Sequence, residues 1–283
     1  MEIPFFISPY SIEEKEAVLK VMEGNWLTAG PKVKEFEEKF AKMHNVKYAL
    51  STNNCTDALE IVAEVLNKYY GYSKVIVPTF TFTSTASAFI RNGFSAYLAD
   101  SNYDDMNIDV ESIKEILDND EERFSNPDYV LCIVHYAGQP CSMDEIVKLC
   151  REREIILVED CAHIPLTKYK DGYVGNFGVF GCYSFYATKN MTCGEGGMIT
   201  TDNDDFYIEA RTTSRNGESI SALEKDKQIR FQDIIKFGRN SRMDEIRGAI
   251  GCVQLDKVEQ YNKRRLELAN LYNKLLEGII GIE

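Results

Sequence analysis

Short apolar runs alternate along most of the chain with longer stretches in which apolar residues recur every three or four positions. Runs of four to eight residues rich in β-branched and aromatic side chains are typical of strands, whereas the longer periodicity is typical of amphipathic helices. We therefore predict strands at residues 47–51, 74–78, 96–100, 129–134, 155–159, 181–185 and 198–201. Helices are predicted between them at residues 56–69, 84–91, 110–117 and 143–153.

Three more helices are predicted outside this alternation. Ser11 and Glu14 have the spacing of a capping box, so a helix should follow Ser11 and stop at Gly24. Pro31 is suited to the first turn of a second helix. The third is a long helical pattern over residues 243–276, which becomes heavily charged after its midpoint.

The order of these elements predicts the fold class. Strands that are separated by helices need crossover connections, and crossovers produce a mainly parallel sheet with helices on both faces. We therefore expect an α/β protein with a mainly parallel central sheet. Polar stretches at residues 102–105 and 119–126 are expected to be surface loops, and residues 214–232 form a longer polar section that would be mobile or contact a partner.

Composition and charge argue against several classes of function. A formal net charge of -13 and a pI near 4.9 oppose nonspecific binding to nucleic acid and to anionic membranes. The eight cysteines form no C-x-x-C pair, so free buried thiols are expected, and the absence of a leader or a membrane-length apolar run predicts a cytoplasmic protein. The three histidines, His44, His135 and His163, lack ligand-like spacing, so no metal site is predicted. We expect His44 at the surface and His135 beside a ligand crevice.

The segment from Cys182 to Gly197 places Lys189 in a short polar loop between an aromatic run and a glycine turn. A lysine acts as a nucleophile only when it is neutral, so its pKa must fall from about 10.4 through desolvation or a neighbouring cation. The apolar and glycine residues around Lys189 would supply that environment, which makes it a candidate covalent anchor for a carbonyl cofactor. A solvent-facing loop lysine is the alternative.

A second candidate lies at the end of the apolar run IILVED, which begins at Ile155 and is typical of a strand buried on both faces. Ligands of open α/β sheets collect at the carboxyl ends of such strands. There, Asp160 would keep a pyridine nitrogen protonated, as pyridoxal phosphate requires to act as an electron sink. A helix N-cap or an ordinary loop carboxylate is the alternative for Asp160.

Seven motifs resemble, in the same order, those of the DegT/DnrJ/EryC1/StrS family of pyridoxal-phosphate sugar aminotransferases, which have the aspartate aminotransferase fold. Together they span nearly the whole chain, and their shared order makes coincidence improbable. They are NWLTAGPKVKEFEEKFA from Asn25, STNNCTDALE from Ser51, VPTFTFTSTA from Val77, VHYAGQP from Val134, VEDCAHI from Val158, SFYATKN from Ser184 with GEGG from Gly194, and GRNSRMDEIRGAIGCVQL from Gly238.

The resemblance implies a fold type I large domain that binds pyridoxal 5'-phosphate over residues 1–245. Residues 246–283 would form a linking helix and the start of a small domain that is otherwise largely absent. It also implies a homodimer with shared active sites, which moves an amino group from glutamate to a keto group of a nucleotide-linked deoxysugar for polysaccharide, lipopolysaccharide or antibiotic amino-sugar synthesis. A related branch of the family has histidine where this chain has Lys189 and removes a hydroxyl group instead, so Lys189 argues against that branch.

The resemblance also assigns the residues that would bind the cofactor phosphate. A helix N-terminus favours an anion through its unpaired N–H groups and its dipole. The phosphate-binding residues implied are Asn54, Cys55, Thr56, Ser184 and, from a neighbouring subunit, Asn240. Cys55 departs from the family, which usually has glycine there. A plain helix cap is the alternative for Asn54 and Thr56, and a turn residue is the alternative for Asn240.

Four further residues are implied around the cofactor ring and the substrate. Phe82 would stack on the pyridine ring, with an ordinary core phenylalanine as the alternative. His163 would lie near the ring and its phenolic oxygen, unless it is a structural histidine with local hydrogen bonds. Thr28 and Glu195 would border the substrate pocket, although each fits a turn equally well.

Two alternatives to the aminotransferase activity remain open at this point. The first is a protein that binds the cofactor or a sugar nucleotide without turnover, motivated by the missing C-terminal lobe. The second is another fold type I enzyme, such as a desulfurase or an amino-acid aminotransferase. Such an enzyme would need an arginine that binds a substrate carboxylate, and no arginine occupies a motif position suited to that role.

Overall fold

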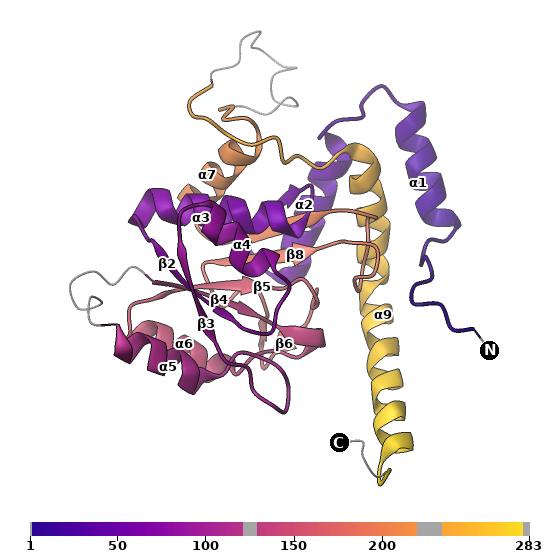
Figure 1. Ribbon diagram of the computed structural model, residues 1–283. Coiled ribbons are helices and arrows are strands. Elements are labelled where there is room, and N and C mark those ends of the chain that lie inside the picture. Colours follow the sequence, from indigo (N-terminus) through magenta and orange to yellow (C-terminus); the bar gives the residue numbers. More distant parts are fainter. Residues whose placement is uncertain (1, 121–128, 220–233, 280–283) are drawn as a thin grey trace.

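The computed structural model describes residues 2–120, 129–219 and 234–279, and it is built around one seven-stranded sheet (Figure 1). The predicted polar stretches 119–126 and 214–232 lie largely outside the described residues. The strand order is β1-β9-β8-β5-β4-β2-β3, and β9 alone runs antiparallel to its two neighbours, which confirms a mainly parallel α/β sheet. The strands are β1 (Tyr48–Thr52), β2 (Lys74–Pro78), β3 (Ser95–Ala99), β4 (Tyr129–Val134), β5 (Ile156–Asp160), β8 (Phe180–Ser184) and β9 (Gly197–Thr201).

Helices cover both faces of the sheet. Because successive side chains of a strand point to opposite faces, one strand can contribute to the cores on both sides. In β4, Val130 and Cys132 join a core with the helices of one face, whereas Leu131 and Ile133 join a second core on the other face. The first face carries α3 (Cys55–Tyr70), α4 (Ser84–Arg91) and α7 (Asp204–Ser214); the second carries α5 (Val110–Asn119) and α6 (Met143–Glu152).

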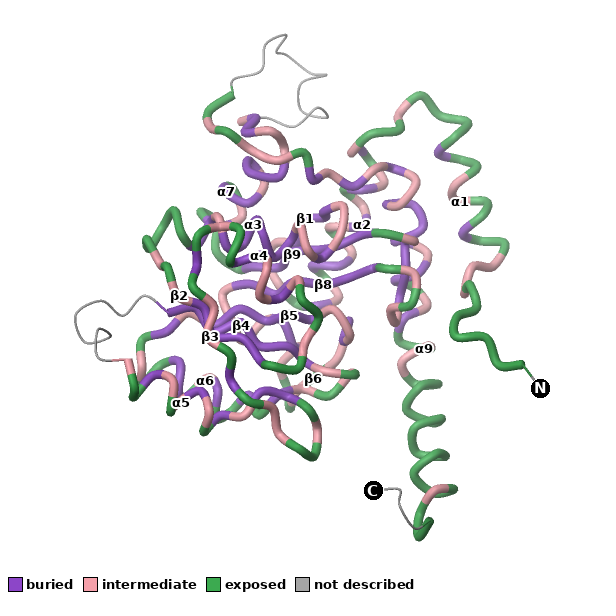
Figure 2. Tube along the Cα trace, in the orientation of Figure 1, coloured by how far each residue is buried: buried purple, intermediate pink, exposed green. Residues whose placement is uncertain are grey.

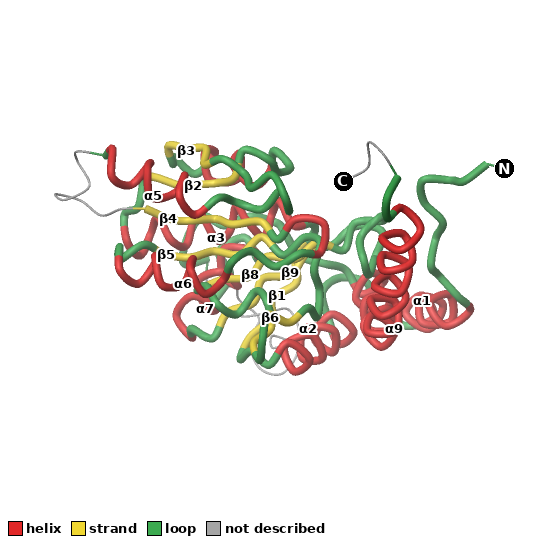
Figure 3. The backbone as a smooth tube through the Cα atoms, turned by 90° about the horizontal axis from the view of Figure 1, so that it is seen from below, coloured by secondary structure: helices red, strands yellow, loops and turns green. Residues whose placement is uncertain are grey.

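A third core lies at the β1 end of the sheet, where α2 (Pro31–His44) and α9 (Glu245–Leu276) pack against Tyr183 and Met198. Helix α1 (Ile12–Glu23) lies beside α9 at the edge of the molecule (Figure 3). Ser11 caps α1 through the predicted capping box. The buried residues of α9 end at Val258, and most of the helix beyond it is exposed (Figure 2).

The predicted strands and helices are confirmed, with ends that differ by at most two residues. Helix α7 and the short hairpin of β6 (Lys168–Tyr169) and β7 (Gly172–Tyr173) were not predicted. In α7 only Phe206 and Ala210 are buried apolar residues, so the helix carries little hydrophobic periodicity. In the described ranges, no helix combines the length and the apolar character needed to cross a membrane.

Two predictions about single side chains have different outcomes. All eight cysteines are free and buried, as predicted. His44 is fully buried, so its predicted surface position is wrong. Its ring stacks on Phe40 with centroids 3.9 Å apart, its Nδ1 lies 3.1 Å from the Phe40 carbonyl oxygen, and its Nε2 accepts from the Leu166 N–H at 3.0 Å. This last contact spans 122 residues, so local sequence could not indicate it.

Candidate active site

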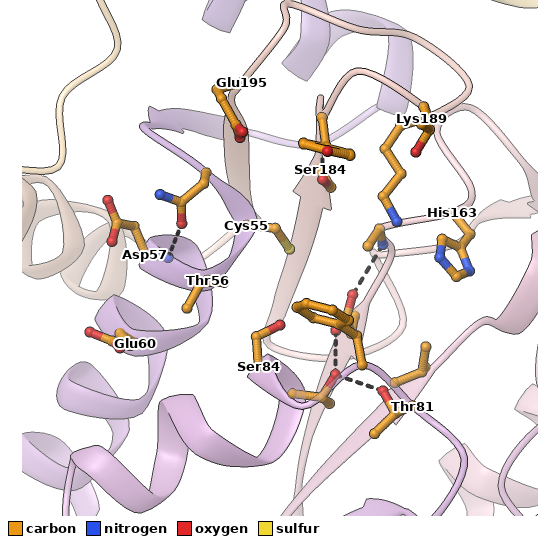
Figure 4. Close-up of a pocket in the computed structure, with 18 of the residues that line it drawn as sticks. Cys55, Thr56, Asp57, Glu60, Thr81, Ser84, His163, Ser184, Lys189 and Glu195 are labelled. Carbon is orange, nitrogen blue, oxygen red and sulfur yellow. Dashed lines mark hydrogen bonds between the residues drawn. The ribbon is translucent and has the colours of Figure 1, made fainter. Parts of the chain in front are cut away.

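A cavity of about 760 Å³ opens where several strands of the sheet end (Figure 4). Its wall includes Val134 at the end of β4, Asp160 at the end of β5 and Ser184 at the end of β8. The N-terminus of α3, the start of α4 with the loop before it, and the loops after β5 and β8 also contribute to the wall. This is the position at which open α/β sheets bind ligands, because loops and helix N-termini converge at the carboxyl edge of parallel strands.

Asp160 lies in the wall of this cavity and is only 4% exposed. Its Oδ2 accepts a hydrogen bond from the Thr85 hydroxyl at 2.9 Å, and its Oδ1 accepts one from the Ala162 N–H at 3.1 Å. Burial raises the pKa of Asp160, and these two hydrogen bonds, with the charge of Lys189, oppose the rise. A cationic group in the cavity would therefore stabilise the ionised form of this carboxylate.

Lys189 reaches into the same cavity from the loop after β8 (Figure 4). Its backbone N–H donates to the Tyr186 carbonyl at 3.0 Å, which closes a turn and aims the side chain inward. Within the described part of the chain, its amine forms no hydrogen bond or ion pair. Desolvation lowers the pKa of Lys189, and the negative charge of Asp160 partly opposes that shift. A larger fraction of this amine is therefore neutral and nucleophilic than for a lysine on the surface.

The N-terminus of α3 forms the opposite end of the cavity. Asn54 is the N-cap, and its Oδ1 accepts from the Asp57 N–H at 2.8 Å. No described residue accepts from the N–H groups of Cys55 and Thr56, so both are available to an anion. Gly197 of β9 permits this arrangement, because a Cβ there would come within 2.4 Å of the Asn54 carbonyl oxygen.

Ser184 and Cys55 line the cavity between this helix end and Lys189. Ser184 is 8% exposed, and its hydroxyl accepts only a long contact of 3.4 Å from the Tyr186 N–H, which leaves its proton free to donate. Burial raises the pKa of the Cys55 thiol, so this residue is a neutral thiol in the wall. It occupies space that a glycine would leave empty.

His163 borders the cavity beside Lys189 (Figure 4). Its Nδ1 accepts from the Ala137 N–H at 3.2 Å, so the neutral ring carries its proton on Nε2. Burial, helped by the charge of Lys189, lowers the pKa of His163 to about 4. The ring therefore stays neutral at physiological pH and offers a donor at Nε2.

The structure groups most, but not all, of the predicted site residues. Phe82 and Glu195 also line the cavity, and Phe82 is 76% exposed. Thr28 and Asn240 are exposed and lie outside the cavity wall of their own chain. The wall also contains residues that the sequence did not indicate, among them Thr81, Ser84, Thr85, Asp57, Glu60 and Arg91. Thr81, Ser84 and Thr85 follow the end of a predicted strand, which was the available signal.

Behind the cavity lies a set of buried groups that we call the rear cluster: Glu159, His135 and the backbone N–H groups of Gly175, Phe177 and Gly178. Glu159 accepts from these three N–H groups at 2.7 Å each, and from His135 Nε2 at 3.1 Å. His135 Nδ1 accepts from the Cys141 N–H at 3.1 Å.

The rear cluster corrects one prediction and explains a geometric coincidence. His135 was predicted beside the crevice, but it is fully buried in the rear cluster, because Val134 takes the cavity side of the strand end. His135, Glu159 and Cys161 also bring one potential ligand atom each within 4.8 Å of one another. Both ring nitrogens of His135 and both oxygens of Glu159 are already hydrogen-bonded, so this group is used for structure.

The arrangement of the cavity agrees with a comparison against known protein families. The DegT/DnrJ/EryC1/StrS aminotransferase family matches residues 10–283. The chain belongs to this family. Aminotransferases of the DegT/DnrJ/EryC1/StrS family use pyridoxal 5'-phosphate, and this chain is therefore a pyridoxal-phosphate-dependent aminotransferase.

Individual relatives of this DegT/DnrJ/EryC1/StrS aminotransferase support the assignment. The spore coat polysaccharide biosynthesis protein SpsC of Bacillus subtilis is 32% identical, over 97% of this chain and 70% of the relative. GDP-perosamine synthase of Escherichia coli O157:H7 is 31% identical, over 99% of this chain and 73% of the relative. The structure of PseC from Helicobacter pylori, an aminotransferase involved in pseudoaminic acid biosynthesis, superposes with a TM-score of 0.89 at 25% identity, covering 99% of this chain and 72% of that one.

The cavity contains the groups that pyridoxal phosphate requires. The amine of Lys189 is the only lysine amine in its wall among the described residues, and it has no partner there. The buried carboxylate of Asp160 suits a protonated ring nitrogen, and the free N–H groups of α3 suit a phosphate. The residues present therefore fit the cofactor that the family uses.

Proposed function

We propose that this aminotransferase moves an amino group from glutamate to a keto group of a nucleotide-linked deoxysugar. Its product would be an amino sugar for polysaccharide, lipopolysaccharide or antibiotic synthesis. The observation that carries the proposal is the meeting of the Lys189 amine and the buried Asp160 carboxylate in one cavity at the edge of the sheet. The names of the relatives, which include a GDP-perosamine synthase, support a sugar nucleotide as the acceptor.

Lys189 and Asp160 carry the chemistry in this proposal. When bound, pyridoxal phosphate supplies an aldehyde that holds the amino group and a ring that accepts electrons. Lys189 anchors the cofactor at rest, and its neutral Nζ then takes the proton from the α carbon of the amino donor. Asp160 keeps a proton on the ring nitrogen, and its burial strengthens that ion pair because little water screens it.

The other predicted residues would hold the cofactor and the substrate. Asn54, Cys55 and Thr56 would bind the phosphate at the α3 N-terminus with the Ser184 hydroxyl. The remaining roles proposed are stacking on the ring for Phe82, donation to its phenolic oxygen for His163, and contact with the substrate for Thr28 and Glu195. The fixed Nε2 proton of His163 suits a phenolate acceptor.

We further propose a homodimer in which Asn240 completes the phosphate site of the second copy. Its side chain is exposed and does not line the cavity of its own chain. Ile235 and Phe237, three residues or fewer before Gly238, are 64% and 100% exposed, which an interface between copies would bury. Light scattering should give a dimer at micromolar concentration; a monomer at all concentrations would contradict this part.

Location and domain division are also proposals. The eight free buried thiols support a reducing compartment, the cytoplasm. Residues 1–245 would form the cofactor-binding domain and residues 246–283 a linking helix that leads into a second domain. The exposure of α9 beyond Val258 supports the division, although the first half of that helix packs into the large core.

Absorbance of the protein with added pyridoxal phosphate tests the cofactor assignment. Wild-type protein should develop the visible band of a cofactor joined to lysine, and Lys189→Ala should not. Lys148→Ala, whose side chain is 74% exposed on α6, is the matched control and should keep the band. A band that survives Lys189→Ala would overturn the assignment.

Turnover separates an enzyme from a binding protein. Addition of glutamate should convert the bound cofactor to its pyridoxamine form, and a protein that only binds would keep the original spectrum. A panel of keto-sugar nucleotides should then restore the starting spectrum. Recovery with none of them would contradict the sugar substrate.

One observation favours a second candidate, an amino-acid aminotransferase. Arg91 lies in the cavity wall, where such an enzyme would need an arginine for the substrate carboxylate. Its guanidinium donates to Glu60 at 2.7 Å and is therefore already paired. Restoration of the spectrum by keto acids other than 2-oxoglutarate, rather than by keto sugars, would favour this candidate.

A further inference from the structure

Asn53 lies immediately before the cap of α3 and contacts a segment almost 190 residues away. Its backbone N–H donates to the Ser241 carbonyl at 3.1 Å, and its Nδ2 donates to the Asn240 carbonyl at 3.2 Å. Arg247 of α9 donates to the Asn53 carbonyl at 3.2 Å and to its Oδ1 at 3.3 Å. Both ends of this amide are therefore used, each by a group of fixed polarity.

The orientation of the Asn53 amide follows from these partners. The guanidinium of Arg247 only donates, and the carbonyl of Asn240 only accepts. A rotation of the amide by half a turn would oppose donor to donor and acceptor to acceptor. Asn53 is thus set in one orientation, with its NH2 group on the Asn240 backbone.

Residues Arg239–Ser241, which we call the Asn240 segment, are held on their other side by the end of α7. The Arg239 N–H donates to the Thr213 carbonyl at 2.6 Å, and the Ser241 N–H donates to the Ser214 carbonyl at 3.0 Å. The backbone of the segment is therefore clamped between α7 and Asn53.

The side chain of Arg239 adds a third attachment for the Asn240 segment. It donates to Asn92 at 3.0 Å and to Glu64 at 3.1 Å, and it also pairs with Glu60 of the cavity wall. In contrast, the side chain of Asn240 is exposed and forms no hydrogen bond to the residues the structure describes. A rigid backbone thus presents a free amide outward.

We propose that Asn53 is a positioning residue that fixes Asn240 for the cofactor site of the second copy, and so links the two sites of a dimer. The inference rests on the proposed function, in which Asn240 acts on the neighbouring phosphate. Asn53 adjoins Asn54, the cap of the helix that would bind the phosphate in its own chain. One turn therefore contributes to both sites. Asn54 and Cys55 act on the cofactor site of their own chain, and Asn53 acts on the site of the second copy.

Mixed dimers test this inference, because they separate the two sites. In a dimer of one Lys189→Ala chain and one chain with intact Lys189, only the intact chain can develop the visible lysine band. The Asn240 that serves this site belongs to the Lys189→Ala chain. Asn53→Ala is placed either on the Lys189→Ala chain or on the intact chain, and the two forms are purified through different tags on the two chains.

The placement of Asn53→Ala should decide the effect. On the Lys189→Ala chain, it should weaken pyridoxal phosphate binding at the reporting site about tenfold, because the opposing Asn240 is no longer held. On the intact chain, it should change the binding constant less than about twofold, since that Asn240 serves the silent site. Titration of the visible band gives both constants.

Two further variants keep the test sharp. Asn53→Asp retains an acceptor for Arg247, loses the donor to Asn240 and adds a negative charge near Asp57. It should show the same dependence on placement if Asn53→Ala fails to fold. Asn67→Ala is the matched control: Asn67 makes an equivalent Nδ2-to-carbonyl bond of 3.2 Å to Tyr72 at the far end of α3. It should be silent in both placements.

The outcomes distinguish this inference from the proposed function. An equal loss in both placements, or a loss only on the intact chain, would show that Asn53 acts on its own site and would overturn the inference. No loss in either placement would overturn it as well. Absence of dimers by light scattering would refute the shared site directly, whereas a band that persists without Lys189 would refute the cofactor assignment.

Discussion

Glu159 and Asp160 are neighbours at the end of β5, yet they lie in opposite kinds of environment. Glu159 faces the rear cluster, where its two oxygens accept four hydrogen bonds. Asp160 faces the cavity and, from the described part of the chain, accepts only two, from Thr85 and Ala162. Both are almost fully buried, so burial alone does not distinguish them.

The difference indicates what each carboxylate does. A buried carboxylate with its lone pairs satisfied stabilises the backbone around it and has little capacity left for a ligand. A buried carboxylate that has free lone pairs and lies beside an unpaired lysine is available to form an ion pair with a charged ligand. The rear cluster therefore supports the fold, and the chemistry that we propose takes place on the cavity side.

The largest effect is expected from Asp160→Asn, which tests the cavity side. An amide cannot hold a proton on the cofactor ring, so aminotransferase activity should fall about a thousandfold, comparable to the loss of a strong electrostatic contact. The melting temperature should change little. Asp202→Asn is the control, since Asp202 also ends a strand region and accepts a backbone N–H, from Lys47, but is exposed.

Glu159→Gln tests the rear cluster through stability. The new NH2 group would oppose backbone donors, leaving buried N–H groups unpaired, so the free energy of unfolding should fall by about 3 kcal/mol. Urea denaturation measures the loss, and activity per folded molecule should be nearly kept. If Glu159→Gln keeps its stability but loses activity, the division between the two carboxylates is wrong.

His44 offers a second structural group, whose effect depends on pH. Burial lowers the pKa of His44 to about 3 from its usual value of 6.5, so the native ring stays neutral while the unfolded ring is protonated below pH 6.5. The unfolded state then binds more protons as the pH decreases. The free energy of unfolding should therefore decrease by about 2 kcal/mol from this group as the pH is lowered from 6.5 to 5. His44→Gln should flatten that part of the urea-denaturation profile; an unchanged slope would show that His44 is not buried as a neutral ring.

The smallest effect concerns the influence of the Asp160 charge on the pKa of Lys189. Desolvation lowers the pKa of Lys189 and Asp160 opposes the shift, so removal of that negative charge should lower the pKa further. In apo-protein, the rate at which Lys189 reacts with a small aldehyde should therefore rise through a lower pH midpoint in Asp160→Asn than in wild type. A midpoint that moves upward would mean that the two groups do not interact.

The fold was largely predictable because burial on both faces leaves a strong local signal in most strands, the partly exposed edge strand β3 being an exception. The runs at residues 74–78 and 129–134 match their strands without error. Strand order and the reversed direction of β9 were not predictable, since they depend on pairing between segments far apart in sequence. Helix α7 was not predicted because its few buried apolar residues give no clear helical periodicity.

For the site, sequence indicated the strand ends but not the side to which each residue points. Asp160 and His135 both follow apolar runs, yet one faces the cavity and the other the rear cluster. A single residue of register decides between these faces. Partners across the chain, such as Thr85 for Asp160, leave no local pattern because they meet only after the sheet has formed.

The buried cysteines make the native chain its own set of unfolding reporters. They are distributed over all three cores, with Cys132 in the first, Cys252 in the α2–α9 core and Cys150 in the core beneath α5 and α6. An alkylating reagent reaches such a thiol only when the surrounding packing opens. Labelling rates read peptide by peptide in a mass spectrometer would therefore show which layer of the protein opens first.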